Sequence, residues 1–194
     1  MGNKIIPRRA ARCKPFPTDP CGRVSQATSP ASGGVAVWKT AGVRVSAKTD
    51  YALRALIEMA GRDDGRPVSA EEIGRLQDIP HGFLQAILAD LRRAGVVASQ
   101  RGQSGGWRMA QDPAAVTVAD VIRAVDGPLV SVYGLRPESV SYNEAAGALQ
   151  HVWIAARSSL REVLEQVTIE ALVERQLPAD VAARTTDEDA WRPH

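Results

Sequence analysis

Apolar residues follow a regular spacing only from about residue 46 onward. Residues 1–42 are rich in Pro, Gly, Ser, Thr and Arg and show no apolar period, and such a composition buries too little apolar surface to fold. We expect these residues to be a disordered extension or a mis-assigned start, with the folded domain beginning at Val43. Apolar positions then recur along one face of a helix, as Tyr51, Ala52, Ala55, Leu56 and Met59.

Two more helical patterns follow, separated by a tight turn. Ser69 and Glu72 have the spacing of a capping box and open a short helix that carries Ile73 and Leu76. A longer helix is expected to end at Gly95. Its expected inward positions are Phe83, Leu84, Ile87, Leu88 and Leu91. A short helix, a tight turn and a longer helix with exposed polar residues are typical of a helix-turn-helix.

A small β-hairpin is expected next, because two short β runs flank the glycine-rich segment 101–106. A second capping box at Thr117 opens a further helix, which Asp126-Gly127-Pro128 breaks. Together these elements predict a winged helix-turn-helix domain over residues 43–127, followed by a loop over 128–143. The expected fold class is mainly α with a small β-wing.

The last regular pattern begins near Glu144, where apolar positions alternate spacings of 4 and 3 residues, as in a heptad seam. We expect a dimerisation helix over 144–176, in which about 30 helical residues would span about 45 Å. A single apolar stripe on so long a helix needs a partner, and a second copy of the chain is the obvious one. Residues 177–194 are acidic and unpatterned and are expected to form a flexible tail. The residues expected at the dimer interface are Leu149, Trp153, Ala156, Leu160, Val163 and Val167.

The net charge is unevenly distributed along the chain. It is +7 over residues 1–45, +1 over 46–110 and −6 over 111–194, for a total of +2. The basic isoelectric point therefore comes from the extension and does not by itself argue for nucleic-acid binding. The segment from Arg92 to Arg108 is different, because it carries four arginines and no acid, a composition that suits contacts with DNA phosphates or the minor groove.

Exposed side chains at the start of the longer helix could read DNA. A helix in the major groove presents side chains to base edges, and Gln85 could form two hydrogen bonds with an adenine. His81 and Gln85 could equally be solvated surface residues, just as Arg92 and Arg93 could simply stabilise the end of the helix. The candidate DNA-binding residues are His81, Gly82, Gln85 and Ala86 in the helix, and Arg101, Gly102, Gln103, Ser104 and Arg108 in the wing.

Signals for catalysis, metal binding and membrane insertion are weak in this sequence. We find no Gly-rich nucleotide loop and no His-Glu-x-x-His, and we expect no enzymatic activity. The two cysteines, Cys13 and Cys21, do not form a disulfide framework or a zinc site, and no cofactor is expected. Since there is neither a stretch of 18 apolar residues nor a secretory signal, we expect a cytoplasmic protein with no membrane partner.

Several segments, taken together and in order, resemble the Rrf2 family of bacterial repressors. The resemblance covers residues 43 to about 175, and its motifs are residues 45–56, 91–97, 101–102, 105–107 and 117–127. It implies a homodimer crossed through the long helix, with a winged helix on each side that reads a palindrome in double-stranded DNA. It also implies DNA contacts at Lys48, Tyr51, His81, Gly82, Gln85 and Arg101.

The chain departs from the family in the loop before the long helix. Members that bind an iron–sulfur cluster carry three cysteines there, whereas residues 128–138 contain none. The resemblance therefore points to the cluster-free members, some of which regulate cysteine metabolism. An arginine, an acid and two phenols in the loop could bind a small anionic effector, or could pin the loop to the dimer helix. These residues are Tyr133, Arg136, Glu138 and Tyr142.

Two kinds of function remain open from the sequence. The first is a sequence-specific transcriptional repressor that binds a palindromic operator as a homodimer and responds to a small metabolite or a protein co-regulator. The second is a winged-helix module that binds a protein partner and has no specific affinity for DNA, because a fold does not dictate a function. A measurable preference for a palindrome over random DNA separates the two.

Overall fold

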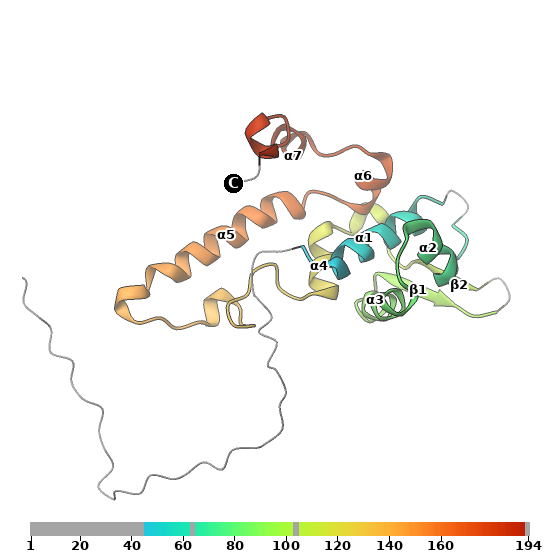
Figure 1. Cartoon of the computed structure of the whole chain (residues 1–194), viewed down its shortest axis with the longest axis horizontal. Coiled ribbons are helices and arrows are strands. Elements are labelled where there is room, and N and C mark those ends of the chain that lie inside the picture. Colours follow the sequence, from blue (N-terminus) through green and yellow to red (C-terminus); the bar gives the residue numbers. More distant parts are fainter. Residues whose placement is uncertain (1–44, 63–64, 103–104, 193–194) are drawn as a thin grey trace, which may run out of the picture. The chain divides into compact units, whose positions relative to one another are not determined.

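The computed structural model describes residues 45–62, 65–102 and 105–192 (Figure 1). The expected extension over 1–42 and two expected wing residues, Gln103 and Ser104, lie outside the described residues. Helices α1 (Ala47–Ala60), α2 (Ala70–Gln77) and α3 (His81–Arg93) come first, followed by strands β1 (Val97–Gln100) and β2 (Gly106–Met109). The remaining helices are α4 (Val118–Val125), α5 (Ala148–Leu164), α6 (Ile169–Glu174) and α7 (Ala179–Ala183). The mainly α fold with a small β-wing is thus confirmed.

Side-chain caps fix where α1, α2 and α4 begin. Ser46, Ser69 and Thr117 each accept a hydrogen bond from the backbone amide three residues later. The cap of α4 is a complete capping box, as the sequence predicts. The box expected at Ser69 is only half formed, because the carboxylate of Glu72 binds the guanidinium of Arg62 at 2.8 Å.

The core of the described domain forms around α1, which packs against α2, α3, α4 and α6. One face of α3 is fully buried in this core, through Leu84, Ile87, Leu88 and Leu91. The expectation that Phe83 also points inward is wrong, since its side chain is 61% exposed. Successive helix residues point about 100° apart, which places residue 83 just outside the buried stripe.

The two strands form an antiparallel hairpin, paired from Val97 with Met109 to Gln100 with Gly106. Val68, which precedes α2, adds to the hairpin through two backbone hydrogen bonds with Trp107, of 2.9 and 2.8 Å. The two backbones approach so closely that only glycine fits at position 106, where a Cβ would lie 2.5 Å from the carbonyl oxygen of Val68. The hairpin is therefore fastened along β2 to the segment that leads into α2.

The single helix expected over 144–176 is wrong, because the chain breaks after α5 and continues as the separate helix α6. At the break, the amide of Val118 donates a hydrogen bond to the carbonyl of Val167. The amide of Ile169 donates to the carbonyl of Val116, and both bonds are 2.9 Å long. Thr168 then caps α6, which packs on α1. Val167 is consequently buried within its own protomer and is not available to a dimer seam.

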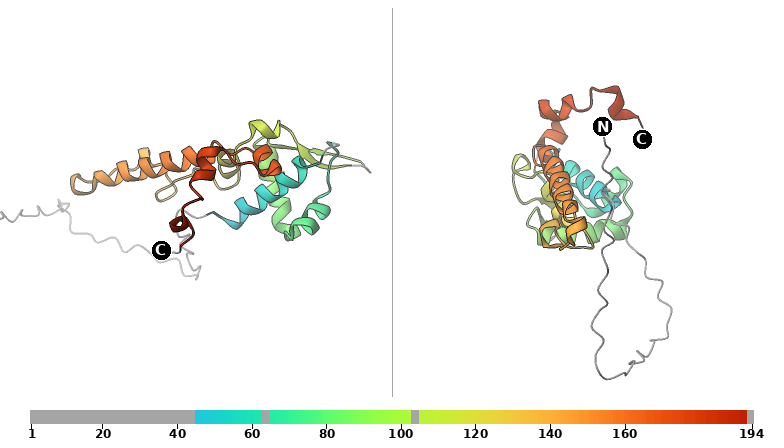
Figure 2. Two further views of the ribbon diagram at one scale, coloured as in Figure 1. Left: turned by 90° about the horizontal axis from the view of Figure 1, so that it is seen from above. Right: turned by 90° about the vertical axis from the view of Figure 1, so that its left-hand side faces the viewer.

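Helix α5 is 17 residues long, about 26 Å at 1.5 Å per residue. It projects away from helices α1 to α4, with its C-terminal end nearest to them, as two perpendicular views show (Figures 1 and 2). The tail expected to be flexible instead forms α7 and a turn of 3-10 helix over Glu188–Trp191. Val181 in α7 is buried, so this segment has an apolar contact that its acidic composition does not reveal.

Candidate nucleic-acid interface

The exposed face of α3 lies opposite the face that is buried in the core. His81, Gly82 and Gln85 are all exposed there, as is Ala86. The first two turns of α3 carry no acidic residue, and the first acid on the helix is Asp90. The structure therefore brings the four predicted helix residues together on one outward face that a polyanion could approach.

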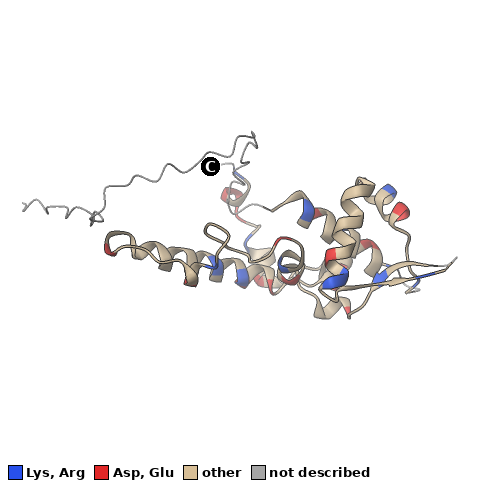
Figure 3. Cartoon of the chain, turned by 90° about the horizontal axis from the view of Figure 1, so that it is seen from below, with Lys and Arg blue, Asp and Glu red and all other residues tan. Residues whose placement is uncertain are grey.

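The hairpin supplies the second part of the candidate interface. Arg101, Gly102 and Arg108 are exposed, and basic residues lie along the hairpin in Figure 3. The guanidinium of Arg92, at the end of α3, lies 5.9 Å from the ring centroid of Trp107 in β2, within cation–π distance. This contact links the end of α3 to the hairpin.

Residues 102–106 have the sequence pattern Gly-x-Ser-x-Gly, which is the motif of the nucleophile elbow in α/β-hydrolases. In that elbow the serine sits between a strand and a following helix. Here the segment joins β1 to β2 within one hairpin. The structural context therefore favours a wing over a catalytic elbow.

Lys48 has two partners inside the protein. Its ammonium donates to the backbone carbonyl of Val125 at 2.5 Å and pairs with the carboxylate of Asp90 at 2.6 Å. The hydrogen bond from Lys48 is the largest contribution that holds the pKa of Asp90 below its usual value, and Arg93 adds a second one. Lys48 thus ties α1 to α3 and to the end of α4, and its expected contact with DNA stays a prediction.

Asp126, at the end of α4, binds the residues at the start of α1. Its carboxylate accepts hydrogen bonds from the hydroxyls of Ser46 and Thr49, the latter at 2.7 Å. Asp90 and Asp126 are the two residues here that the sequence reasoning missed as positioning residues. From the sequence, Asp126 is only part of a helix-breaking turn. Lys48 lies more than 40 residues from Asp90 in the chain, and Thr49 lies more than 40 residues from Asp126.

The other expected α1 contact, Tyr51, is half-buried. The guanidinium of Arg54 lies 5.5 Å from its ring centroid. The ring therefore presents only part of its surface to solvent, and its expected contact with DNA stays a prediction.

The loop over 128–143 is attached to α5 by several hydrogen bonds. Glu138 pairs with Arg157 at 2.6 Å, and the indole of Trp153 donates to the phenol oxygen of Tyr142 at 3.2 Å. Tyr133 projects from a tight turn and is 88% exposed. The four candidate effector residues are therefore not gathered into one site by these contacts, and two of them pin the loop to the helix.

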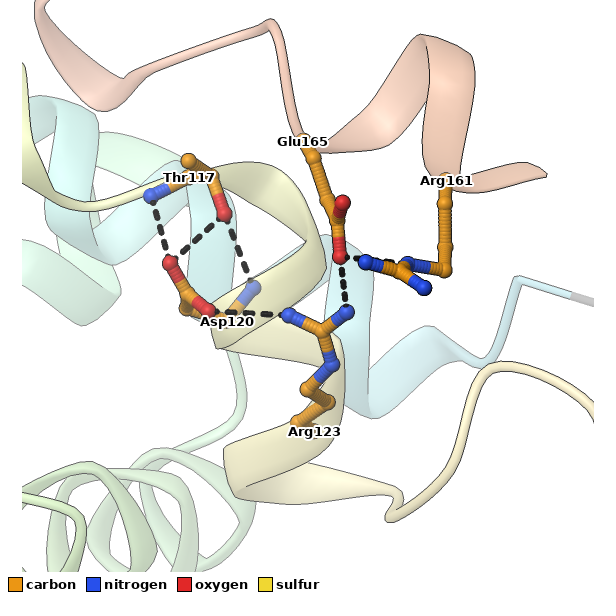
Figure 4. Close-up of polar contacts among 5 residues, drawn as sticks. All are labelled: Thr117, Asp120, Arg123, Arg161 and Glu165. Atoms are coloured by element: carbon orange, nitrogen blue, oxygen red, sulfur yellow. Dashed lines mark hydrogen bonds and ion pairs between the residues drawn. The ribbon is translucent and has the colours of Figure 1, made fainter. Parts of the chain in front are cut away.

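A chain of charged contacts joins the winged-helix domain to α5 (Figure 4). Arg123 in α4 pairs with Asp120 at 3.0 Å and with Glu165, the residue that follows α5. Arg161 reaches the same carboxylate at 2.9 Å. The hydrogen bond from Arg161, reinforced by Arg123, keeps the pKa of Glu165 low, so this carboxylate stays ionised and bridges the two parts.

Metal and membrane sites are not found in the part of the chain that the structure describes. Across residues 45–62, 65–102 and 105–192, no three His, Cys, Asp or Glu side chains gather where they could hold a metal ion. Within the same residues, no helix combines the length and the apolar character needed to cross a bilayer.

The sequence profile of the Rrf2 family, described as iron-dependent transcriptional regulators, matches residues 45–175. An HTH-type transcriptional regulator of Mycobacterium tuberculosis strain H37Rv is 38% identical over 145 residues, covering 75% of this chain and 90% of the relative. The HTH-type transcriptional regulator CymR of Bacillus subtilis is 32% identical over 130 residues, covering 67% of this chain and 89% of the relative.

Solved structures of two regulators resemble the fold. The structure of CymR, the global cysteine regulator of B. subtilis, aligns with a TM-score of 0.58 at 32% identity and covers 69% of this chain and 98% of that one. IscR of T. potens aligns with a TM-score of 0.57 at 26% identity and covers 78% of this chain and 98% of that one.

Proposed function

Because the chain belongs to the Rrf2 family of DNA-binding transcriptional regulators, we propose that it acts as a homodimeric repressor of a palindromic operator. Helix α3 of each protomer enters a major groove, and the hairpin contacts the neighbouring phosphates or minor groove. The observation that carries this proposal is the geometry of α3. Its inner face is fixed in the core by four fully buried side chains, while its outer face is exposed and free of acids in the first two turns.

The proposal of a homodimer rests on α5. None of its 17 residues is buried within the protomer, although the helix is amphipathic. Leu149 and Val152 are 43% and 52% exposed, and Trp153, Ala156, Leu160 and Val163 are only partly covered. An apolar stripe of this kind is stable in water only when another surface covers it, and a second α5 presents the matching surface.

The family is described as iron-dependent, but the residues of the loop do not fit an iron–sulfur cluster. Segment 128–143 contains neither cysteine nor histidine, and such clusters are held by cysteine thiolates, with histidine as the occasional substitute. We therefore assign no role to iron in the response of this protein. A small metabolite or a protein co-regulator is the proposed signal, and sulfur metabolism is the first process to test because CymR is described as a cysteine regulator.

Selection from a randomised duplex library tests this function directly. We expect the purified full-length protein to enrich a palindrome whose half-sites lie about one helical turn apart, and to bind it at least about a thousandfold tighter than random DNA. Light scattering should give a dimer in the same buffer. If no sequence is enriched, the protein is not a sequence-specific regulator, and a winged-helix protein-interaction module describes it better.

A further inference from the structure

The side chain of Phe83 is mostly exposed and lies outside the hydrophobic core. Of the large apolar side chains in α1 to α4, all of which the structure describes, only Leu76 and Phe83 are exposed, by 44% and 61%. Phe83 is not among the core residues or those packed against them. Its neighbours on the outer face of the helix, Gly82 and Ala86, are too small to cover the ring. The aromatic side chain therefore stands free at the third position of α3.

The surroundings of Phe83 suit the floor of a major groove. It lies between His81 and Gln85 in the first two turns of α3, which contain no acid that would repel a phosphate backbone. The first acid, Asp90, lies two turns away and is neutralised by Lys48 and Arg93. The polar side chains can bind base edges through hydrogen bonds, whereas the ring has no hydrogen-bonding group and suits an apolar contact.

We propose that Phe83 contacts the C5-methyl group of a thymine, so that α3 selects thymine at one position of each half-site. Among the base edges in the major groove, the apolar group is the C5-methyl of thymine, and phenylalanine is suited to contact it. This inference rests on the proposed function, since it assumes that α3 enters that groove. It adds a specificity-determining residue that the sequence pattern placed in the core.

Replacing thymine by deoxyuridine removes the methyl group and leaves every hydrogen-bonding atom in place, which makes a direct test. In the duplex enriched by selection, each thymine is replaced by deoxyuridine in turn, symmetrically in both half-sites. The wild-type protein should lose about fourfold in affinity per methyl lost, or about fifteenfold for the pair of half-sites, at one thymine position. Phe83→Ala should bind the thymine duplex about as weakly as the wild type binds the deoxyuridine duplex, and should no longer distinguish the two.

Leu76→Ala is the matched control, because it removes an exposed apolar side chain of the same helix-turn-helix from α2 rather than α3. It should keep the full preference for thymine. Phe83→Ala should melt at the wild-type temperature, because the ring is exposed and its loss leaves no cavity. The inference is overturned if Phe83→Ala retains the wild-type preference for thymine over deoxyuridine, or if no thymine in the selected duplex is sensitive to the replacement. Both outcomes leave specific DNA binding intact, so they differ from a failure of the proposed function, in which no duplex is enriched at all.

Discussion

The pair formed by Lys48 and Asp90 shows how one partly buried contact can orient the helix that we propose reads DNA. Asp90 lies on α3 beyond the exposed first turns, and its carboxylate is only 19% exposed. Lys48 extends from α1 and also holds the last carbonyl of α4. Three helices therefore depend on one ammonium group, which fixes the direction in which α3 presents its outer face.

We predict that Asp90→Asn lowers the free energy of unfolding by about 1 kcal/mol at pH 7. Folding lowers the pKa of Asp90, with the hydrogen bond from Lys48 as the largest cause. Its stabilisation is therefore complete above the unfolded pKa of about 3.9 and is lost as the pH falls through the folded value. Urea unfolding of both proteins at pH 7 and at decreasing pH measures the difference, which should shrink below pH 4. The control is Asp50→Asn, since Asp50 pairs with Arg54 only at 3.4 Å and is 58% exposed; an equal loss there would show that the Lys48 contact has no special weight.

Replacing Arg101 or Gln85 by alanine should impair DNA binding in two different ways. Arg101 lies at the start of the hairpin tip, so Arg101→Ala should weaken binding to all duplexes and lower the salt dependence by about one unit. Gln85→Ala should instead cost about 1–3 kcal/mol on the selected operator and relax the preference at one base pair per half-site. Titrations against the operator, its single-base variants and random DNA at several salt concentrations distinguish the two. Unchanged binding of both variants to every duplex would show that α3 and the hairpin do not meet DNA in this way.

Helix α5 and the break that follows it determine how much apolar surface is left for a second copy. The seam retains Leu149, Trp153, Ala156, Leu160 and Val163, whereas Val167 is used inside the protomer. On the other side, the loop uses Tyr142 and Glu138 to cover part of α5. The interface proposed for the dimer is therefore shorter than the heptad pattern of the sequence suggests.

We predict that Leu160→Glu converts the dimer to a monomer, because a charge in the seam would be buried without a partner. Light scattering with a concentration series measures the mass, and circular dichroism checks that the helices remain. Ser158→Glu is the control, since Ser158 is exposed on α5 outside the seam, and it should stay dimeric. A Leu160→Glu protein that remains dimeric with normal DNA affinity would place the interface elsewhere.

At the scale of the molecule, charged contacts connect the domain proposed to face DNA with the helix proposed to face the partner. Arg123 belongs to α4, and Glu165 follows α5. The loop over 128–143 is attached to α5 through Gln150, whose amide donates to the carbonyls of Pro137 and Val140 at 3.2 Å each. A signal received at this loop would therefore act on α5 and, through Arg123, on the winged-helix domain.

We predict that the protein binds no iron–sulfur cluster. Protein purified without air should show no visible absorption band and no stoichiometric iron, because the chain has only Cys13 and Cys21 and segment 128–143 provides neither cysteine nor histidine. Iron and acid-labile sulfide analysis measures this together with the absorption spectrum. Iron at one atom per chain or more would contradict the prediction, and a Cys13→Ser, Cys21→Ser variant would then show whether the two thiols hold it.

Local chemistry determined most of the elements. Caps at Ser69 and Thr117 and the periodic apolar residues depend only on neighbours within one or two turns, and the structure confirms the helix starts that these caps predict. The glycine-rich hairpin was predictable for the same reason, because turn residues act over a few positions. The resemblance to the family rests on the same local motifs. It also implied that the exposed residues at the start of α3 contact DNA.

Tertiary structure decided what local patterns leave open. The heptad spacing continues to Val167, yet backbone pairing with Val116 and Val118 ends α5 at Leu164. Phe83 is apolar and adjacent to a buried residue, and only the packing of α3 against the core shows that it faces solvent. The contacts of Asp90 likewise join residues far apart in the chain. A sequence period cannot report such contacts, because they depend on which surfaces meet once the chain is folded.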